Sequence, residues 1–394
     1  MSQATVYFKN FNAIRFLAAF GVIFHHFMIS NNLIDDSMLG EFALSIGKLS
    51  VVLFFTLSGF LITFLLLTEY EKNNSINIKH FYIRRILRIW PLYYFVVLLS
   101  LYFLNTNIFF RWVPMSDSIQ HDFLIKNILY LFMLPNVGYA FGYHLPYADQ
   151  TWSIGVEEQF YLFWPPLLFL FKNPAKPIIS VIVVYLMVKV GLYYFNPFHH
   201  SLLTYWSILC FDVMALGGGA ALIVFKFNRV NGSIFFNKLF IVLFLTIMIS
   251  LLLFSVNFGV LHYEVYALFF CYLLIVLAKH NKKIPLFSSS IVDYLGKISF
   301  GLYMYHFIAI RVVYIFNYKF PLYSNPLSNF LLVTLTTIVI SAISYEVLEK
   351  FFIKKKLRYS NVVSGDNVRS YVKQSSALNE LPQDINHNAK LQSR

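Results

Sequence analysis

The chain has 394 residues, of which 58% are hydrophobic and only 12% are charged. Soluble domains contain about 25% charged residues, so this composition excludes an ordinary soluble protein and indicates a membrane protein. The net charge of +13 comes from Lys and Arg in short loops beside apolar runs. This pattern is typical of loop anchoring at a membrane and argues against nucleic-acid binding. Cys210 and Cys271 lie inside apolar runs, so we expect buried thiols that form neither a disulfide nor a metal site.

Apolar runs of about 20 residues, the length that crosses ~30 Å of hydrocarbon, predict ten transmembrane helices. The ten runs cover 11–30, 46–68, 86–104, 152–171, 178–195, 203–225, 238–256, 259–279, 296–316 and 327–349. A weaker run over 124–141 contains an Asn and a Pro, which favours a re-entrant or interfacial segment over a full crossing. The predicted fold class is therefore all-α, a polytopic membrane helical bundle.

The positive charges in the loops predict how the chain is oriented. If the N-terminus is cytoplasmic, the basic loops "EYEKNNSINIKHFYIRR", "KNPAKP" and "KHNKK" all face inward, whereas the opposite loops are poor in Lys and Arg. This arrangement requires that 124–141 does not cross. We therefore expect both termini in the cytoplasm, a membrane-embedded domain over 1–358, and a polar, disordered cytoplasmic tail over 359–394.

The first predicted helix contains an arginine and two histidines within the apolar stretch "RFLAAFGVIFHHF". Ionisable side chains are costly inside a membrane span and are functional candidates by default. Arg15 and His26 are eleven positions apart, so they share one helix face about 16 Å apart along the axis. His25 lies about 80° from that line, and we expect it to be a packing residue. A structural role stays open for the other two residues. Arg15 can be an interfacial cation, and His26 can be a hydrogen-bonded packing residue.

A second cluster of cations lies in "HFYIRRILRIWPLYY", at the predicted cytoplasmic entrance of the third span. Arg84, Arg85 and Arg88 lie within five residues, and the last two share one helical side. Guanidinium groups bind phosphate oxygens in pairs, so this cluster predicts a site for a phosphorylated cosubstrate that arrives from the cytoplasm. The alternative is ordinary anchoring by positive charge.

Acidic residues stand at the start of another span, in "TWSIGVEEQFYLFWPP". Glu157 and Glu158 lie near the N-terminus of this predicted helix, where the helix dipole stabilises carboxylates, so a structural role is possible. A carboxylate at the membrane boundary can also orient a histidine or a hydroxyl substrate.

Four smaller features accompany these clusters. Ser58-Gly59 in mid-span favours a close-packing notch between helices over a nucleophile. His306 is a single imidazole among aromatic residues, and packing and substrate contact are equally open for it. Asp212 and Lys189 are further charges inside predicted spans, without assignable partners.

Taken in order, these motifs resemble those of the acyltransferase type 3 family of integral-membrane O-acyltransferases. The resemblance covers about 10–350 and rests on five elements: Arg-x10-His at Arg15 and His26, "FFTLSGFLIT", "FYIRRILRIWPLYY", "WSIGVEEQFYLFWP" and "LGKISFGLYMYH". The chain departs from the family pattern at Cys210, where an arginine is usual, and at Lys350, where proline is common. The first departure leaves the role of Asp212 open.

The resemblance implies transfer of an acyl group, usually acetyl from acetyl-CoA, to a hydroxyl of an extracytoplasmic carbohydrate at a bacterial cytoplasmic membrane. It implies the stand-alone form of the enzyme and no metal. The expected catalytic residues are His26, Glu157 and Arg15. The expected residues for the CoA phosphates are Arg84, Arg85 and Arg88. The expected substrate contacts are Glu158, Trp152 and His306. His26 would act as a general base on the acceptor hydroxyl or carry the acyl group itself.

Two other classes of function compete with this interpretation. A transporter or flippase for an anionic or polyprenyl-linked envelope precursor would use the arginines to bind phosphate and His26 to relay protons. The segments with polar residues do not recur between the two halves of the chain, and this weakens the transporter hypothesis. A membrane sensor or scaffold without catalysis is the third option.

Overall fold

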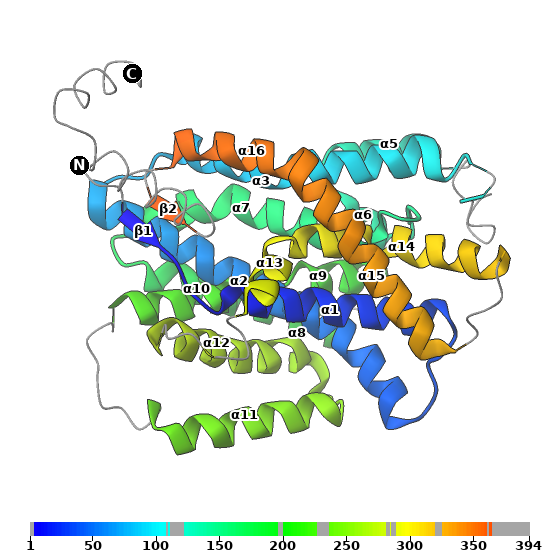
Figure 1. Ribbon diagram of the computed structural model, residues 1–394. Coiled ribbons are helices and arrows are strands. Elements are labelled where there is room, and N and C mark those ends of the chain that lie inside the picture. The colour runs from blue at the N-terminus through cyan, green and yellow to red at the C-terminus, as the bar shows by residue number, and fades with distance from the viewer. Residues whose placement is uncertain are drawn as a thin grey trace.

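The computed structural model describes residues 4–107, 109–110, 122–195, 200–226, 236–280, 284, 289–319, 325–360 and 362–364. Within these ranges the chain forms a bundle of helices, most of which run side by side along one direction (Figure 1). Eight helical stretches in the described ranges are long and apolar enough to cross a membrane. The structure therefore supports a polytopic helical membrane protein.

The elements follow one another along the chain with short connections. The first part contains β1 Ala4–Val6, α1 Phe11–Ser30, α2 Met38–Asn73, α3 Ile78–Leu99 and the π-helical turn η1 Ser100–Leu104. The middle part contains α5 Phe123–Leu131, α6 Pro135–Ala140, the 3-10 turn η3 Asp149–Thr151, α7 Trp152–Leu170, α8 Ala175–Phe195, α9 His200–Leu209 and α10 Phe211–Lys226. The last part contains α11 Lys238–Leu253, η5 Gly259–Leu261, α12 His262–His280, α13 Ser290–Lys297, α14 Ser299–Lys319, α15 Pro326–Ser344, η7 Tyr345–Glu349, α16 Lys350–Lys356, η8 Leu357–Tyr359 and β2 Val362–Ser364.

The count of ten spans predicted from the sequence is not confirmed. Eight of the ten correspond to the long apolar helical stretches, and the other two correspond to α7 and α11. Helix α11 has 16 residues and ends at Leu253 because the chain turns at Ser255, which has a positive φ of 50°. Helix α7 is 19 residues long, but its Glu-Glu-Gln stretch makes it more polar than the others.

The segment predicted to be re-entrant or interfacial forms two short helices, α5 and α6, with nine and six residues. At about 1.5 Å per residue, neither helix spans the hydrocarbon core. The loop that follows leads into η3 and α7.

Side chains just before several helices fix where those helices begin. The Ser37 hydroxyl accepts a hydrogen bond from the Gly40 N–H at the start of α2, and Asn77 accepts one from the His80 N–H at the start of α3. Asn325 does the same for the Leu327 N–H of α15, with Pro326 in the first turn. These are the residue types that satisfy the free N–H groups of a helix N-terminus.

Small residues allow α2 and α10 to pack closely in the middle of the bundle. A Cβ atom on Gly59 would overlap the carbonyl oxygen of Met214, and one on Gly217 would overlap the carbonyl oxygen of Thr56. The predicted packing notch at Ser58-Gly59 is therefore present at Gly59. This contact also fixes the position of Ser58, which precedes Gly59 on α2.

A buried cluster of charged side chains links α8, α10 and α12. The Lys189 ammonium group donates to a carboxylate oxygen of Glu264 at 2.5 Å, and both side chains are buried. Asp212 is also buried beside this pair, with Glu264 and Lys189 as its electrostatic neighbours. Lys189 and Asp212, for which the sequence offered no partners, thus lie in one buried cluster.

The two ends of the described chain meet beside α2. Strands β1 and β2 pair in parallel, with Ala4 opposite Val362, and they lie together at one edge of the bundle (Figure 1). Helix α16 packs along α3. Val362–Ser364 belongs to the segment predicted as a disordered tail, and 365–394 lies outside the described residues.

Candidate active site

A narrow cavity of about 140 Å³ lies among α1, α2, α3, α7 and α14. Three arginines line it, Arg15 from α1 with Arg85 and Arg88 from α3, and Glu157 and Tyr161 of α7 lie on the same wall. We call it the arginine cavity. The structure thus brings together the two cationic motifs that the sequence placed about 70 residues apart.

The arginines of α3 differ in what holds them. Arg84 donates to the buried Glu69 carboxylate at 2.9 Å and to the Tyr359 carbonyl oxygen at 2.7 Å. Arg85 lies over the rings of Phe81 and Tyr161, and its Nε atom is buried without a hydrogen-bond partner. Arg88 makes no hydrogen bond or ion pair with any described residue. Arg84 is therefore bound within the fold, whereas Arg85 and Arg88 have donors that no described residue uses.

The two glutamates of α7 point to different neighbours. Glu157 accepts hydrogen bonds from the Ser58 hydroxyl and from the Tyr161 hydroxyl, each at 2.8 Å. Glu158 accepts one from the Trp90 indole N–H at 3.0 Å, and its other carboxylate oxygen has no partner. Glu157 thus belongs to the arginine cavity, where its charge opposes those of Arg15 and Arg85.

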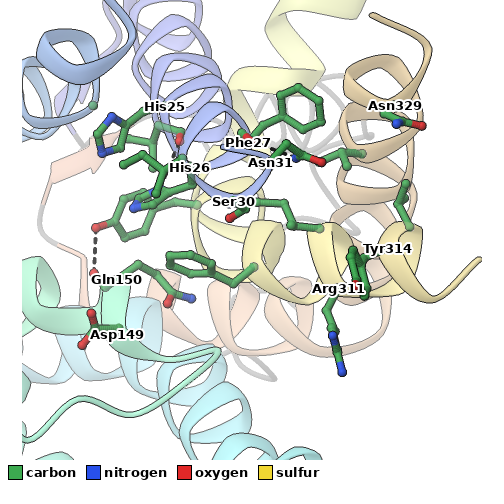
Figure 2. Close-up of a pocket in the computed structure, with 18 of the residues that line it drawn as sticks. His25, His26, Phe27, Ser30, Asn31, Asp149, Gln150, Arg311, Tyr314 and Asn329 are labelled. Carbon is green, nitrogen blue, oxygen red and sulfur yellow. Dashed lines mark hydrogen bonds between the residues drawn. The ribbon is translucent and has the colours of Figure 1, made fainter. Parts of the chain in front are cut away.

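A larger cavity of about 850 Å³ lies at the other end of α1. His25 and His26 line it from α1, and Asp149, Gln150 and Trp152 line it from the start of α7 and the turn before it. Figure 2 shows His26 on one side of this cavity with Asp149 and Gln150 across from it. We call it the histidine cavity.

The His26 ring is paired with a second imidazole at the edge of this cavity. The Nε2 atom of His306 lies 3.1 Å from the Nδ1 atom of His26, and the two rings stack with centroids 4.8 Å apart. His306 is fully buried and does not line the cavity, whereas His26 is partly exposed in it. The structure thus places His306 behind His26 and not in contact with the space in which a substrate would lie.

The hydrogen bonds of this pair determine which nitrogen of His26 is free. The Nδ1 atom of His306 lies 2.6 Å from the Tyr303 carbonyl oxygen, which can only accept, so this Nδ1 carries the proton. The Nε2 atom of neutral His306 is then an acceptor, and Nδ1–H of His26 donates to it. The Val22 carbonyl at 3.1 Å is a second acceptor for the same proton. The unprotonated Nε2 atom of His26 remains available as a base.

His25 is held in another way. Its Nδ1 atom lies 2.7 Å from the Ala43 carbonyl oxygen of α2, and its ring fills the space above Gly47. A side chain at residue 47 would overlap the ring. His25 therefore packs α1 against α2, as the helical spacing suggested.

Tyr303 of α14 lines both cavities. Its hydroxyl donates to the Gln150 carbonyl oxygen at 2.7 Å and lies 2.7 Å from the Ser153 hydroxyl. A second bond from Gln150 Nε2 to the Met304 carbonyl ties the same turn to α14. Tyr303 is thus the one described residue that the linings of the two cavities share.

An ion pair stands next to the histidine cavity, outside the spanning helices. His144 Nδ1 lies 2.8 Å from a carboxylate oxygen of Asp149. The hydrogen bond to Asp149 raises the pKa of His144 above its ordinary value of 6.5. Asp149 thus presents a charged acceptor group to the cavity while its partner holds it in place.

The nine site residues predicted from sequence fall into three groups. Arg15, Arg85, Arg88 and Glu157 lie at the arginine cavity, while His26 and Trp152 lie at the histidine cavity. The structure does not bring Glu157 to His26. Glu158, His306 and Arg84 line neither cavity, although His306 contacts His26 and Arg84 lies beside Arg85 on α3.

Sequence reasoning missed Tyr303 and Asp149. Tyr303 is one of 27 tyrosines and has no charge to mark it. Asp149 lies in a long loop, where a carboxylate has no cost and gives no signal. The motif "LGKISFGLYMYH" contains Tyr303, and this was the one pattern that marked its position.

Comparison with known proteins agrees with this geometry. An acyltransferase domain family matches residues 8–346. The chain is 34% identical over 197 residues to the peptidoglycan O-acetyltransferase OatA of Listeria monocytogenes, which covers 47% of this chain and 30% of that protein. It is 26% identical over 393 residues to a putative O-acetyltransferase of Staphylococcus aureus strain COL, which covers 90% of this chain and 59% of that protein.

The chain therefore spans between about a third and three fifths of the length of these relatives. No solved structure matches it. The family match extends over nearly all of the helical bundle, including both cavities, and agrees with the five motifs in their order. The chain belongs to the acyltransferase type 3 family of integral-membrane O-acyltransferases.

Proposed function

We propose that the protein transfers an acyl group from cytoplasmic acyl-CoA to a hydroxyl of a carbohydrate outside the membrane, with His26 at the reaction centre. Acetyl is the expected group, because the relatives are named O-acetyltransferases. The observation that carries the proposal is the pair of cavities at the two ends of α1, one cationic and one with a free imidazole nitrogen, which share Tyr303 as a wall.

The arginine cavity suits the donor. CoA carries a diphosphate and a ribose 3′-phosphate, and guanidinium groups bind such oxygens with paired, charge-assisted hydrogen bonds. Arg85 and Arg88 have donors that no described residue uses. With the N-terminus in the cytoplasm, as the loop charges predict, Arg15 at the start of α1 and the α3 arginines lie at the cytoplasmic side. The pantetheine arm would extend past Tyr303 toward His26.

The histidine cavity suits a carbohydrate acceptor. Its volume of about 850 Å³ is within the range of small-molecule sites, about 300–1,000 Å³. Trp152 and Tyr139 present neighbouring aromatic rings with centroids 5.5 Å apart, and Asp149 lies beside them. Aromatic faces and carboxylates match the apolar faces and the hydroxyl groups of a sugar. In the proposed orientation this cavity lies toward the outer side of the membrane.

The chemistry follows from the free Nε2 atom of His26. This nitrogen takes the proton of the acceptor hydroxyl as the oxygen attacks the thioester carbonyl carbon. The C–O ester bond forms, the C–S bond breaks with its electron pair on sulfur, and His26 returns the proton to the CoA thiolate. Transfer through an acyl group carried on Nε2 would use the same lone pair and give the same products. His306 fixes the tautomer of His26, as an orienting partner does in other base-catalysed acyl transfers.

A reconstituted-vesicle assay tests the proposal. Labelled acetyl-CoA is supplied on one side and peptidoglycan-derived oligosaccharides on the other, and CoA release and labelled glycan are measured. We expect both products from the native protein and neither from His26→Ala. His25→Ala is the matched control and should keep transfer. Normal turnover in His26→Ala with none in His25→Ala would contradict the assignment, and glycan translocation without acyl transfer would favour the flippase.

A further inference from the structure

Lys356 is the last residue of α16 and lies near the arginines that we propose bind the CoA donor. It is more than 260 positions from any of them in the sequence. Its electrostatic neighbours are Arg85, Arg88, Arg84 and Arg15. Helix α16 packs along α3 (Figure 1), and the Tyr359 carbonyl three residues later is bonded to Arg84. Five cations from three helices therefore surround one region of the structure.

No carboxylate of the described residues is paired with Lys356, whereas Glu69, Glu157 and Glu349 each face one or two of the arginines. Its ammonium group makes no hydrogen bond or ion pair with any described residue, and its strongest electrostatic neighbours are four arginines. Like charges at such positions repel, and their repulsion is strong where water is partly excluded. A multivalent anion would convert this repulsion into attraction, so the arrangement points to a ligand with several negative charges.

The five cations are not equivalent in position. Arg15, Arg85 and Arg88 line the arginine cavity, whereas Arg84 and Lys356 do not line it. In CoA the diphosphate is joined directly to pantetheine, and the 3′-phosphate lies farther away on the ribose. If the arm enters the cavity, the diphosphate meets the lining arginines and the 3′-phosphate lies farther out. Of the two cations outside the cavity, Arg84 is already bonded to Glu69. Lys356 is therefore the outer cation whose donors no described residue uses.

We infer that Lys356 binds the ribose 3′-phosphate of the CoA donor and thereby selects CoA over carriers that lack this group. The inference rests on the proposed function, because it uses the same donor site. It assigns to α16, beyond the last long helix, a part in donor recognition that no sequence motif indicated. The arginines then bind the part of the donor common to all pantetheine nucleotides, and Lys356 reads the part that distinguishes CoA.

Calorimetric titration of the full-length protein in detergent, with CoA and with 3′-dephospho-CoA, tests this inference without acyl transfer. We expect the native protein to bind CoA about tenfold or more tightly than dephospho-CoA, since one charge-assisted contact contributes roughly this factor. Lys356→Gln should weaken CoA to the level of dephospho-CoA and leave dephospho-CoA unchanged. Lys356→Arg should keep most of the discrimination. Lys354→Gln is the matched control, because Lys354 is exposed on the same helix.

Three outcomes would overturn the inference. Undiminished discrimination in Lys356→Gln would remove Lys356 from the site, and equal weakening of both ligands would reduce its role to diffuse attraction. If discrimination disappears when phosphatidylglycerol is added in nanodiscs, Lys356 binds a lipid headgroup instead. Failure of the proposed function is distinguishable: binding with the expected discrimination but no acetyl transfer would overturn that function and leave the Lys356 site in place.

Discussion

His306 Nε2 and His26 Nδ1 lie 3.1 Å apart although the two residues are separated by 280 positions. The contact joins α14 to α1 at the edge of the larger cavity and leaves one nitrogen of His26 free to act on a substrate. A neutral buried imidazole that accepts a hydrogen bond from another imidazole does not contribute a charge. Its effect is to fix the orientation and tautomer of His26.

Replacing His306 by Phe should lower kcat by about 100-fold or more, because general-base catalysis contributes roughly 10²–10⁴ and depends on the correct tautomer. The KM values for donor and acceptor should change little, since His306 lines neither cavity. Steady-state kinetics on the reconstituted enzyme measures kcat and the two KM values separately. His262→Gln is the control, because His262 lines neither cavity, and it should keep near-native kcat. A large rise in acceptor KM with unchanged kcat would show that His306 contacts substrate instead.

Arg88 and Arg84 should respond differently to the same substitution. Arg88→Gln should raise the KM for acetyl-CoA by roughly tenfold or more through the loss of charge-assisted hydrogen bonds to phosphate, with an unchanged melting temperature. Arg84→Gln should destabilise the fold by about 3 kcal/mol, because it leaves the buried Glu69 carboxylate without its cation. Donor titrations and thermal melts of both variants check the contrast. The prediction would be contradicted if Arg88→Gln and Arg84→Gln changed the KM for acetyl-CoA and the melting temperature to the same extent.

The close contact between α2 and α10 predicts a strong packing effect at Gly59. Gly59→Ala would place a methyl group against the Met214 carbonyl oxygen, so the helices must separate. Overpacking of this kind costs about 1–3 kcal/mol, and a thermal melt in detergent should show it. Gly191→Ala in α8 is the control, because no atom lies within 4 Å of the added Cβ. A native-like melt for Gly59→Ala would mean that this contact is looser than the structure indicates.

The positions of the helices follow from the sequence, and the pairing of side chains between them does not. Long apolar runs require helices in a membrane, and the spacing of Arg15 and His26 along one helix was enough to place them at opposite ends of one face. The span over 238–256 was predicted too long because hydropathy alone does not register the turn at Ser255.

In the candidate site, too, the sequence predicted single residues but not their contacts across helices. Charged motifs identified Arg15, Arg85 and Arg88, because charge inside a span is costly and therefore conspicuous. Glu157 was expected to orient His26 or the acceptor, but hydrogen bonds from Ser58 and Tyr161 place it at the arginine cavity. The His26–His306 contact and the approach of Lys356 to α3 depend on how distant helices pack, for which a single sequence contains no direct signal.

The His144–Asp149 pair predicts a pH dependence of stability that is independent of the reaction. The hydrogen bond to Asp149 raises the pKa of His144 in the folded state above its ordinary value of 6.5. The pair therefore stabilises the fold fully below that value, and the contribution is lost as the pH rises through the higher folded-state pKa. Both side chains are partly exposed, so the effect should be less than about 1 kcal/mol. Thermal melts of the native protein and His144→Gln should differ most near pH 5.5 and converge by about pH 9. A difference that grows toward alkaline pH would show that another group, and not this pair, titrates.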